Sequence, residues 1–143
     1  MNDDRQLEFV DTNILIYAHD TTAGEKHQRA ISLLSGLWST QRGCLSVQIL
    51  QEFYVNVTRK LPQRLSHEQA VEIIADFAAW PVFSPNAQDV LTAITLQGRY
   101  DLSFWDAMVV WSASRLACTI LWSEDLNAGQ VYEGVRVLNP FGQ

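Results

Sequence analysis

The chain has 143 residues, the size of one domain, so we expect a single domain spanning residues 1–143. Hydrophobic residues make up 48% and charged residues 18%, a composition typical of a folded globular protein and not of a disordered one. The formal net charge of −6 weighs against a nucleic-acid partner unless the acids are gathered in one place, because phosphates are contacted mostly by Lys and Arg.

The chain begins with MNDDRQ, which is acidic and lacks the apolar core of a signal peptide. No apolar run approaches the roughly 20 residues of a membrane span, so we expect no membrane association and a cytoplasmic location. LEFV at 7–10 predicts a first strand, and Asp11 can cap a helix that starts at Ile14. Residues 25–39 have apolar side chains at helical spacing and predict a second helix.

GCLS at 43–46 predicts a short strand, and its last residue, Ser46, can cap a helix that runs to about Lys60. The sequence Ser66-His-Glu-Gln69 is a capping box and predicts the start of another helix. PVFS at 81–84 is a candidate strand.

A helix is predicted from Asn86 to Gln97, where we expect Gly98 to end it. Ser103 precedes a nearly apolar stretch, 104–117, which predicts a further helix. CTILWS at 118–123 and VRVLNP at 135–140 predict the last two strands. Because strands alternate with helices along the chain, we expect an α/β fold with a parallel sheet covered on both faces.

Two carboxylates directly follow predicted strands. Asp11 ends the first strand, and Asp125 lies just past the strand at 118–123. Ligands of open parallel sheets bind beyond the carboxyl ends of the strands, so these two side chains should converge on one edge of the sheet. Asp11 also interrupts the apolar run FVDTNILIYAHD, where an unpaired buried carboxylate would be costly.

Four acids, Asp11, Glu52, Asp106 and Asp125, each have an ordinary structural explanation. Asp11 can be a helix cap, and Asp106 can form a weak capping box with Ser103. Glu52 can be a solvated acid at the border of a helix face, and Asp125 can belong to a turn. Together, however, four acids from separate segments can share one pocket. Their mutual repulsion there would be relieved by a hard divalent cation such as Mg²⁺ or Mn²⁺.

Four motifs follow one another along the chain: VDTN at 10–13, Glu52 after SVQILQ, LSFWDA at 102–107 and WSEDLN at 122–127. This ordered set resembles the PIN domain, specifically the VapC-type toxin nucleases, and the ending VRVLNPF resembles a subgroup of these proteins. The resemblance implies a three-layer α/β/α sandwich with a central, mainly parallel sheet. It also implies an endoribonuclease that depends on Mg²⁺ or Mn²⁺.

The resemblance assigns the acidic, metal-binding site to Asp11, Glu52, Asp106 and Asp125, with Asn13 and Ser123 in supporting positions. It suggests that Asp11 and Asp106 are the main metal ligands and that Asp125 helps directly or through water. Glu52 would hold a second metal or position the attacking water. Hydrolysis would leave a 5′-phosphate and a 3′-hydroxyl.

RNA is the expected substrate. Arg59, Lys60 and Arg64, in TRKLPQR, are candidate contacts to its phosphates, although a solvated helix end explains them slightly better. The resemblance implies a small antitoxin protein as partner, whose basic segment would suit an acidic pocket, and a homodimer is expected.

Several other residues are given structural roles. We expect Cys44 and Cys118 to be buried free thiols and Glu124 to lie on the surface. Trp105 next to Asp106 can stack on a base, but burial is the favoured interpretation. The tryptophans expected in the core are Trp38, Trp80, Trp111 and Trp122.

Alternative functions remain open at this point. A haloacid-dehalogenase-like hydrolase or a response-receiver domain is disfavoured, because position 13 is Asn and no lysine follows Lys60. A non-catalytic RNA- or protein-binding module on the same fold is a second candidate. A housekeeping RNase that is not a toxin is a third.

Overall fold

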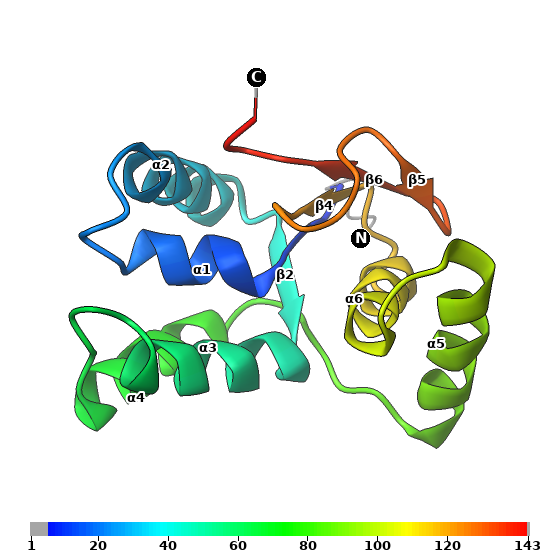
Figure 1. The fold of residues 1–143 in the computed structure, drawn as a ribbon, viewed down its shortest axis with the longest axis horizontal. Coiled ribbons are helices and arrows are strands. Elements are labelled where there is room, and N and C mark those ends of the chain that lie inside the picture. The colour runs from blue at the N-terminus through cyan, green and yellow to red at the C-terminus, as the bar shows by residue number, and fades with distance from the viewer. Residues whose placement is uncertain (1–5, 143) are drawn as a thin grey trace.

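The protein is described from a computed structural model, which describes residues 6–142 (Figure 1). The expectation that there is no signal peptide rests on the acidic start of the chain. Residues 1–5 of that stretch lie outside the described residues. Within residues 6–142, none of the helices combines the length and the apolar character that crossing a bilayer requires.

Six strands form one sheet in the order β3-β2-β1-β4-β6-β5. They are β1 (Glu8–Val10), β2 (Gly43–Ser46), β3 (Val82–Phe83), β4 (Ile120–Trp122), β5 (Val131–Tyr132) and β6 (Val135–Leu138). Neighbouring strands are parallel except for β5 and β6, which form an antiparallel pair at one edge. The mainly parallel sheet is thus confirmed, while the two-residue β5 was not predicted from the sequence.

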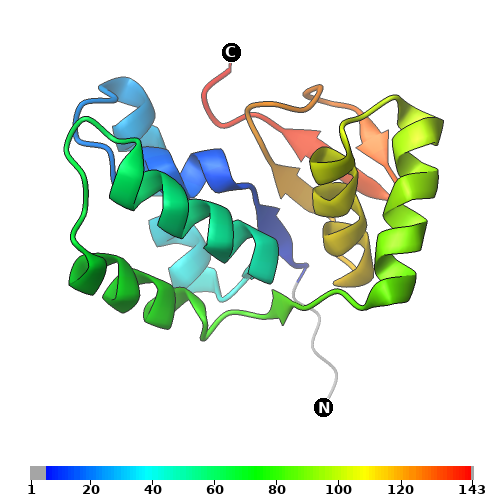
Figure 2. The same cartoon turned by 60° about the horizontal axis from the view of Figure 1, so that its bottom comes forward.

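Six helices cover the sheet. They are α1 (Thr12–Ala18), α2 (Glu25–Thr40), α3 (Val47–Arg59), α4 (His67–Phe77), α5 (Ala87–Tyr100) and α6 (Phe104–Arg115). Figure 1 shows α1 to α4 on one side of the strands and α5 and α6 on the other, and Figure 2 shows the same layers after rotation. Helix α6 packs against β2, β4 and β6, and α5 packs on α6. This arrangement confirms the α/β/α sandwich.

The helix starts follow the predicted caps. The Ser46 hydroxyl accepts from the backbone N–H of Ile49 at the start of α3, and Ser66 with Gln69 forms the complete capping box of α4. Helix α1 begins at Thr12, two residues earlier than predicted, with Asp11 as its N-cap. These short-range hydrogen bonds satisfy backbone donors that have no partner inside a helix, so they define where each helix begins.

The predicted end of α5 at Gly98 is wrong. The helix continues through Gly98 to Tyr100 and ends at Asp101, whose backbone is left-handed at φ 54°. A glycine costs a helix only about 1 kcal/mol relative to Ala. The last residue of the helix, Tyr100, contacts residues later in the chain. Its hydroxyl donates to Glu133 at 2.7 Å and its ring packs edge-on to Tyr132. Tertiary contacts therefore extend the helix beyond its weak point.

The buried side chains of both helix layers and the sheet form one hydrophobic cluster. Cys44 on β2 and Cys118 before β4 belong to it as free thiols, with their sulfurs 3.0 Å apart. Each thiol is almost completely buried, as the apolar neighbours in the sequence predicted. In this state the pKa of Cys44 is raised by the contact with Cys118 and by burial.

The tryptophans are less uniformly buried than expected. Trp80 is buried, Trp111 and Trp122 are half-buried, and Trp38 is 40% exposed. The favoured burial of Trp105 is wrong, because its side chain is 61% exposed. Val109, one turn later on the same helix, is buried, so the exposed surface at Trp105 does not continue along this face of α6.

Candidate active site

The carboxyl ends of β1 and β4 lie side by side at the centre of the sheet. Val10 pairs with Trp122, and the backbone N–H of Asp11 donates to the Trp122 carbonyl at 2.9 Å. From β1 the chain builds β2 and β3 on one side and later β4 and β6 on the other. The two strand ends therefore form the topological switch point, where open α/β sheets bind their ligands.

Asp11 lies at this switch point as a buried carboxylate, with 6% of its surface exposed. One oxygen accepts the backbone N–H of Thr12 at 2.7 Å, and the other accepts the Ser123 hydroxyl at 2.7 Å. Burial, and to a smaller extent the nearby carboxylates of Asp125 and Asp106, raise the pKa of Asp11 to about 7 in spite of these hydrogen bonds. Asp11 is thus both the helix cap and a member of a group of acids.

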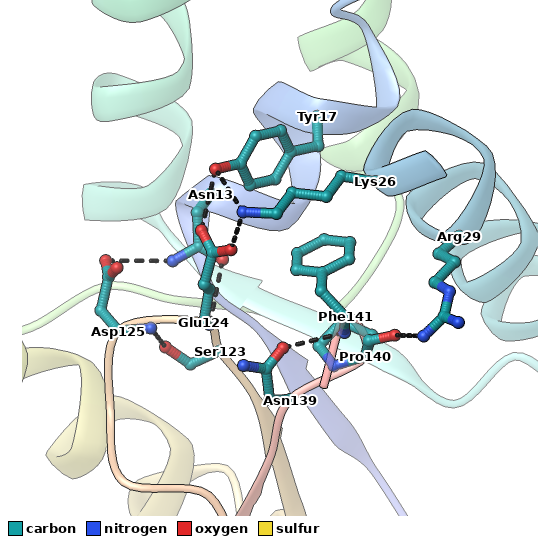
Figure 3. Close-up of polar contacts among 10 residues, drawn as sticks. All are labelled: Asn13, Tyr17, Lys26, Arg29, Ser123, Glu124, Asp125, Asn139, Pro140 and Phe141. Atoms are coloured by element: carbon teal, nitrogen blue, oxygen red, sulfur yellow. Dashed lines mark hydrogen bonds and ion pairs between the residues drawn. The ribbon is translucent and has the colours of Figure 1, made fainter. Parts of the chain in front are cut away.

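Asn13 connects Asp125 to α1 (Figure 3). Its amide nitrogen donates to the Asp125 carboxylate at 3.1 Å, and its amide oxygen accepts the backbone N–H of Glu124 at 3.3 Å. The Ser123 hydroxyl accepts the backbone N–H of Asp125 at 3.2 Å while donating to Asp11. Asn13 and Ser123 therefore contact the acids beside which the sequence placed them.

Asp106 enters from the opposite helix layer, in the first turn of α6. The Ser103 hydroxyl accepts its backbone N–H at 3.1 Å and so begins the helix at this point. The half-buried side chain has a raised pKa, first because of desolvation and then because Asp125 and Glu52 are negatively charged neighbours. Asp106 thus lies within electrostatic range of acids from three other segments.

Glu52 is half-buried on α3, and two side chains hold its carboxylate. The Thr12 hydroxyl donates to one oxygen at 2.5 Å, and the Gln48 amide donates to the other at 3.1 Å. Gln48 also donates to the Trp105 carbonyl at 3.4 Å, which connects α3 to the start of α6. Neither Thr12 nor Gln48 was predicted as a site residue. Their signal in the sequence is their position within the motifs VDTN and SVQILQ.

The structure thus brings Asp11, Asp106, Asp125 and Glu52 to one edge of the sheet, from four separate segments. The three basic residues proposed as RNA contacts lie elsewhere. Arg59 is exposed at the end of α3, about 10 Å along the helix axis from Glu52 at 1.5 Å per residue. Lys60 and Arg64 are exposed just beyond the helix.

The acids are suited to a hard cation, although they do not form a ready-made cage. Within residues 6–142, no three His, Cys, Asp or Glu side chains are placed to hold a metal ion as they stand. Mg²⁺, however, commonly keeps several waters and binds through only one or two carboxylates. The pKa values of Asp11 and Asp106 are raised first by burial and then by neighbouring carboxylates, and a bound divalent cation would favour the ionised form of both side chains.

The expectation that Glu124 is a surface residue is wrong. Its carboxylate accepts the Tyr17 hydroxyl at 2.8 Å and forms an ion pair with Lys26, and its side chain is only 23% exposed (Figure 3). A sequence cannot indicate these contacts, because Lys26 is 98 positions away.

Fold and site together define a class of α/β/α protein with acidic side chains gathered at the switch point of a parallel sheet. A sequence model of the PIN domain matches residues 9–134, and the chain therefore belongs to the PIN domain family. No curated protein matches the sequence significantly.

Solved structures with the same fold include three toxin–antitoxin proteins. A toxin–antitoxin complex from Klebsiella pneumoniae aligns with TM-score 0.68 at 19% identity, covering 94% of this chain and 98% of that one. The toxin VapC20 of Mycobacterium tuberculosis, which cleaves the sarcin-ricin loop, aligns with TM-score 0.65 at 22% identity, covering 90% and 98%. DNA-bound VapBC from Salmonella typhimurium aligns with TM-score 0.65 at 14% identity, covering 94% and 98%.

Proposed function

We propose that the protein is a metal-dependent endoribonuclease, formed by residues 1–143 as one domain, and the toxin of a VapBC-type pair. The observation that supports this most is the gathering of Asp11, Glu52, Asp106 and Asp125 at the switch point of a PIN fold. The likeness to VapC20, which cleaves the sarcin-ricin loop, supports RNA as the substrate class.

The proposed roles follow from burial and position. Asp11 and Asp106 are the main ligands for Mg²⁺ or Mn²⁺, and the exposed Asp125 helps directly or through water. Glu52, held by Thr12 and Gln48, binds a second metal or positions the attacking water. A divalent cation supplies charge neutralisation and activates water for phosphodiester hydrolysis at neutral pH. The products are a 5′-phosphate and a 3′-hydroxyl.

Within this proposal, Asn13 and Ser123 orient the ligands through the hydrogen bonds described above. Removing a residue that hydrogen-bonds a metal ligand commonly lowers metal affinity by about 10- to 100-fold. Arg59, Lys60 and Arg64 remain proposed phosphate contacts for a longer RNA, at a distance from the acids. Because the chain carries a net charge of −6, we expect weak and salt-sensitive RNA binding.

The proposed protein partners are a small antitoxin and a second copy of the chain. The likeness to VapBC complexes supports the antitoxin, and the acidic site favours a basic antitoxin segment. Exposed apolar residues on α5, namely Val90, Leu91 and Ile94, support a homodimer. A cytoplasmic location belongs to the same proposal, since free thiols are typical of reducing compartments.

The nuclease assignment is tested with purified protein, labelled RNA and Mn²⁺. We expect Asp11→Asn to reduce cleavage by at least about 100-fold, an order of magnitude typical of losing a charged active-site group. Asp76→Asn, which changes an exposed carboxylate on α4, is the matched control and should cleave as the wild type does. Undiminished cleavage by Asp11→Asn would contradict the assignment.

A non-catalytic binding module is separated from a nuclease by metal titration. We expect Mn²⁺ to raise the melting temperature of the wild type and to have little effect on Asp106→Ala. A binding module would show no stabilisation in either protein. A toxin, in contrast to a housekeeping RNase, should arrest growth when expressed alone, and the gene beside its own should encode a small antitoxin that restores growth.

A further inference from the structure

Lys26, in the first turn of α2, forms an ion pair beside the acidic site (Figure 3). We propose that Lys26 is a positioning residue for Asp125, acting through Glu124 and Tyr17. This inference rests on the proposed function in one respect only, the role of Asp125 as a metal-site residue. It gives a role to Glu124, which is next to Asp125 in the chain and contacts Tyr17 and Lys26.

Three side chains from three segments meet at this ion pair. The Glu124 carboxylate accepts the Tyr17 hydroxyl at 2.8 Å and contacts the Lys26 ammonium through its second oxygen. The Lys26 ammonium also reaches the Tyr17 hydroxyl at 3.5 Å. Tyr17 belongs to α1 and Lys26 to α2, so the segment after β4 is fastened to two helices at once.

The same segment is held a second time through its backbone. Asn13 accepts the backbone N–H of Glu124 at 3.3 Å and donates to the Asp125 carboxylate at 3.1 Å. Residues 123–127 have no helix or strand of their own to keep them in place. The position of the exposed Asp125 therefore depends on contacts made by its neighbours, among them the ion pair of Glu124 with Lys26 and the buried side chains of Ser123 and Leu126.

The C-terminal segment covers this ion pair. The Phe141 ring packs edge-on to Tyr17 at 5.1 Å, and the Lys26 ammonium lies 5.0 Å from the Tyr17 ring centre and 5.7 Å from that of Phe141. Arg29 reaches the carbonyls of Pro140 and Gly142 at 3.4 Å each, which fastens the segment to α2. The cover is partial, because the Lys26 side chain stays 43% exposed, and Glu124 at 23% exposed is the better shielded partner of the ion pair.

A phosphate contact is a less suitable role for Lys26. Its charge is already offset by Glu124, and its ammonium has the Tyr17 hydroxyl as a further partner. To bind RNA, Lys26 would have to leave a half-buried carboxylate without its cation, which is costly. The contacts point instead to a fixed brace for the segment that carries Asp125.

The test compares Lys26→Met, Glu124→Gln and Lys26→Arg with the wild type. Glu72→Gln is the control, because it removes an exposed carboxylate on α4, a helix that takes no part in these contacts. Amide hydrogen exchange of residues 123–127 is measured on metal-free protein, which requires no activity. Stabilisation by Mn²⁺ alone, and kcat and KM for RNA, are measured alongside.

We expect Lys26→Met and Glu124→Gln to exchange about 10-fold faster in residues 123–127. We expect them to need about 10-fold more Mn²⁺ for half-maximal stabilisation, which is the lower end of the loss in metal affinity seen when a residue that supports a metal ligand is removed. Their kcat at limiting Mn²⁺ should fall while KM for RNA stays unchanged. Lys26→Arg should largely keep the wild-type values, since Arg retains the charge and the donors, and Glu72→Gln should match the wild type.

Unchanged exchange and unchanged Mn²⁺ dependence in Lys26→Met would overturn the proposal. A raised KM for RNA with normal exchange would also overturn it and would make Lys26 a phosphate contact. If the wild type cleaves no RNA, the proposed function fails. The exchange of residues 123–127 then still decides whether Lys26 holds this segment.

Discussion

Asp11 combines two tasks that make opposite demands on one side chain. As the N-cap of α1 it accepts a backbone N–H, which favours the ionised carboxylate. As a buried residue near Asp106 and Asp125, it is ionised at a cost, and its pKa is raised from 3.8 to about 7. Without a bound cation, the ionised carboxylate of Asp11 is therefore unfavourable in the folded protein. Shifted pKa values of this kind are common at active sites.

The raised pKa of Asp11 makes a prediction for stability. Between pH 4 and 7 the folded protein binds more protons at Asp11 than the unfolded chain does. The contribution of Asp11 to the free energy of unfolding therefore falls as pH rises through this range, and it levels off above pH 7. Asp11→Asn removes that contribution. Metal-free Asp11→Asn should thus be more stable than the wild type at pH 8, by up to about 4 kcal/mol at 1.36 kcal/mol per pKa unit.

Urea unfolding of both proteins in EDTA, from pH 4.5 to pH 8, measures this difference. The two free energies of unfolding should converge towards the acidic end of the range. A constant gap between wild type and Asp11→Asn at every pH would show that Asp11 has an ordinary pKa in the folded protein.

At the scale of elements, α5 and α6 are joined by a second buried carboxylate. Asp89, with 2% of its surface exposed, completes the capping box of α5 with Asn86. From α6, Trp111 donates to Asp89 at 3.0 Å and Arg115 donates at 3.1 Å. The hydrogen bond with the Asn86 backbone, followed by those two partners, lowers the pKa of Asp89. This buried acid, in contrast to Asp11, is fully satisfied by the protein itself.

Asp89→Ala should destabilise the protein by about 2–3 kcal/mol, because it removes the acceptor of the Asn86 backbone N–H in the capping box and leaves the partly buried Trp111 donor without an acceptor. Since the folded pKa is lowered, the stabilisation by Asp89 is present above its ordinary pKa and is lost as pH falls below about 4. Thermal unfolding at pH 7 and pH 3 measures both effects. Gln88→Ala, one residue away and exposed, is the control and should change stability little.

Strand β2 depends on a glycine for packing. A Cβ atom on Gly43 would lie 2.5 Å from the ring of the buried Trp80, which cannot move aside as the end of a flexible chain could. Gly43→Ala should therefore cost about 1–3 kcal/mol, the usual effect of overpacking a core. Gly36→Ala in the middle of α2, where a Cβ meets nothing within 4 Å, should instead stabilise by about 0.5–1 kcal/mol. Chemical denaturation of the two variants should give shifts of opposite sign.

At the scale of the whole molecule, α5 has an apolar outer face as well as the inner face that packs on α6. Val90, Leu91 and Ile94 are 39%, 58% and 51% exposed. Continuous exposed apolar surface of this kind marks interfaces more often than free solvent surface. The homodimer proposed above would cover it.

Leu91→Asp should convert a dimer to a monomer, because it places a charge in the middle of the proposed interface. Light scattering after size-exclusion chromatography, at several protein concentrations, measures the mass. Glu72→Asp, a conservative change at an exposed residue of α4, is the control and should leave the mass unchanged. A Leu91→Asp protein that keeps the dimer mass, or a monomeric wild type, would contradict a dimer through α5.

Short-range features of the sequence predict the fold class and most of the helix starts. Alternating strands and helices predicted the parallel α/β/α fold, and serine caps at Ser46, Ser66 and Ser103 predicted three helix starts. These features act between residues a few positions apart, so a linear sequence displays them. The positions of Asp11 and Asp125 directly after strands likewise predicted that these two side chains would converge on one edge of the sheet, since parallel strands end on the same side.

Other features were decided by contacts between residues distant in the chain. Whether Trp105 is buried, whether α5 passes Gly98 and which cation Glu124 meets all depend on how helices and loops pack on one another. No local pattern reports such packing, because the partners lie on different elements. The sequence by itself determined most of the helices and strands and the two acids that follow strands, because these features depend on residues close together in the chain. The tertiary structure alone decided how buried each acid is, which side chains hold it, and that Lys26 and Glu124 meet beside Asp125.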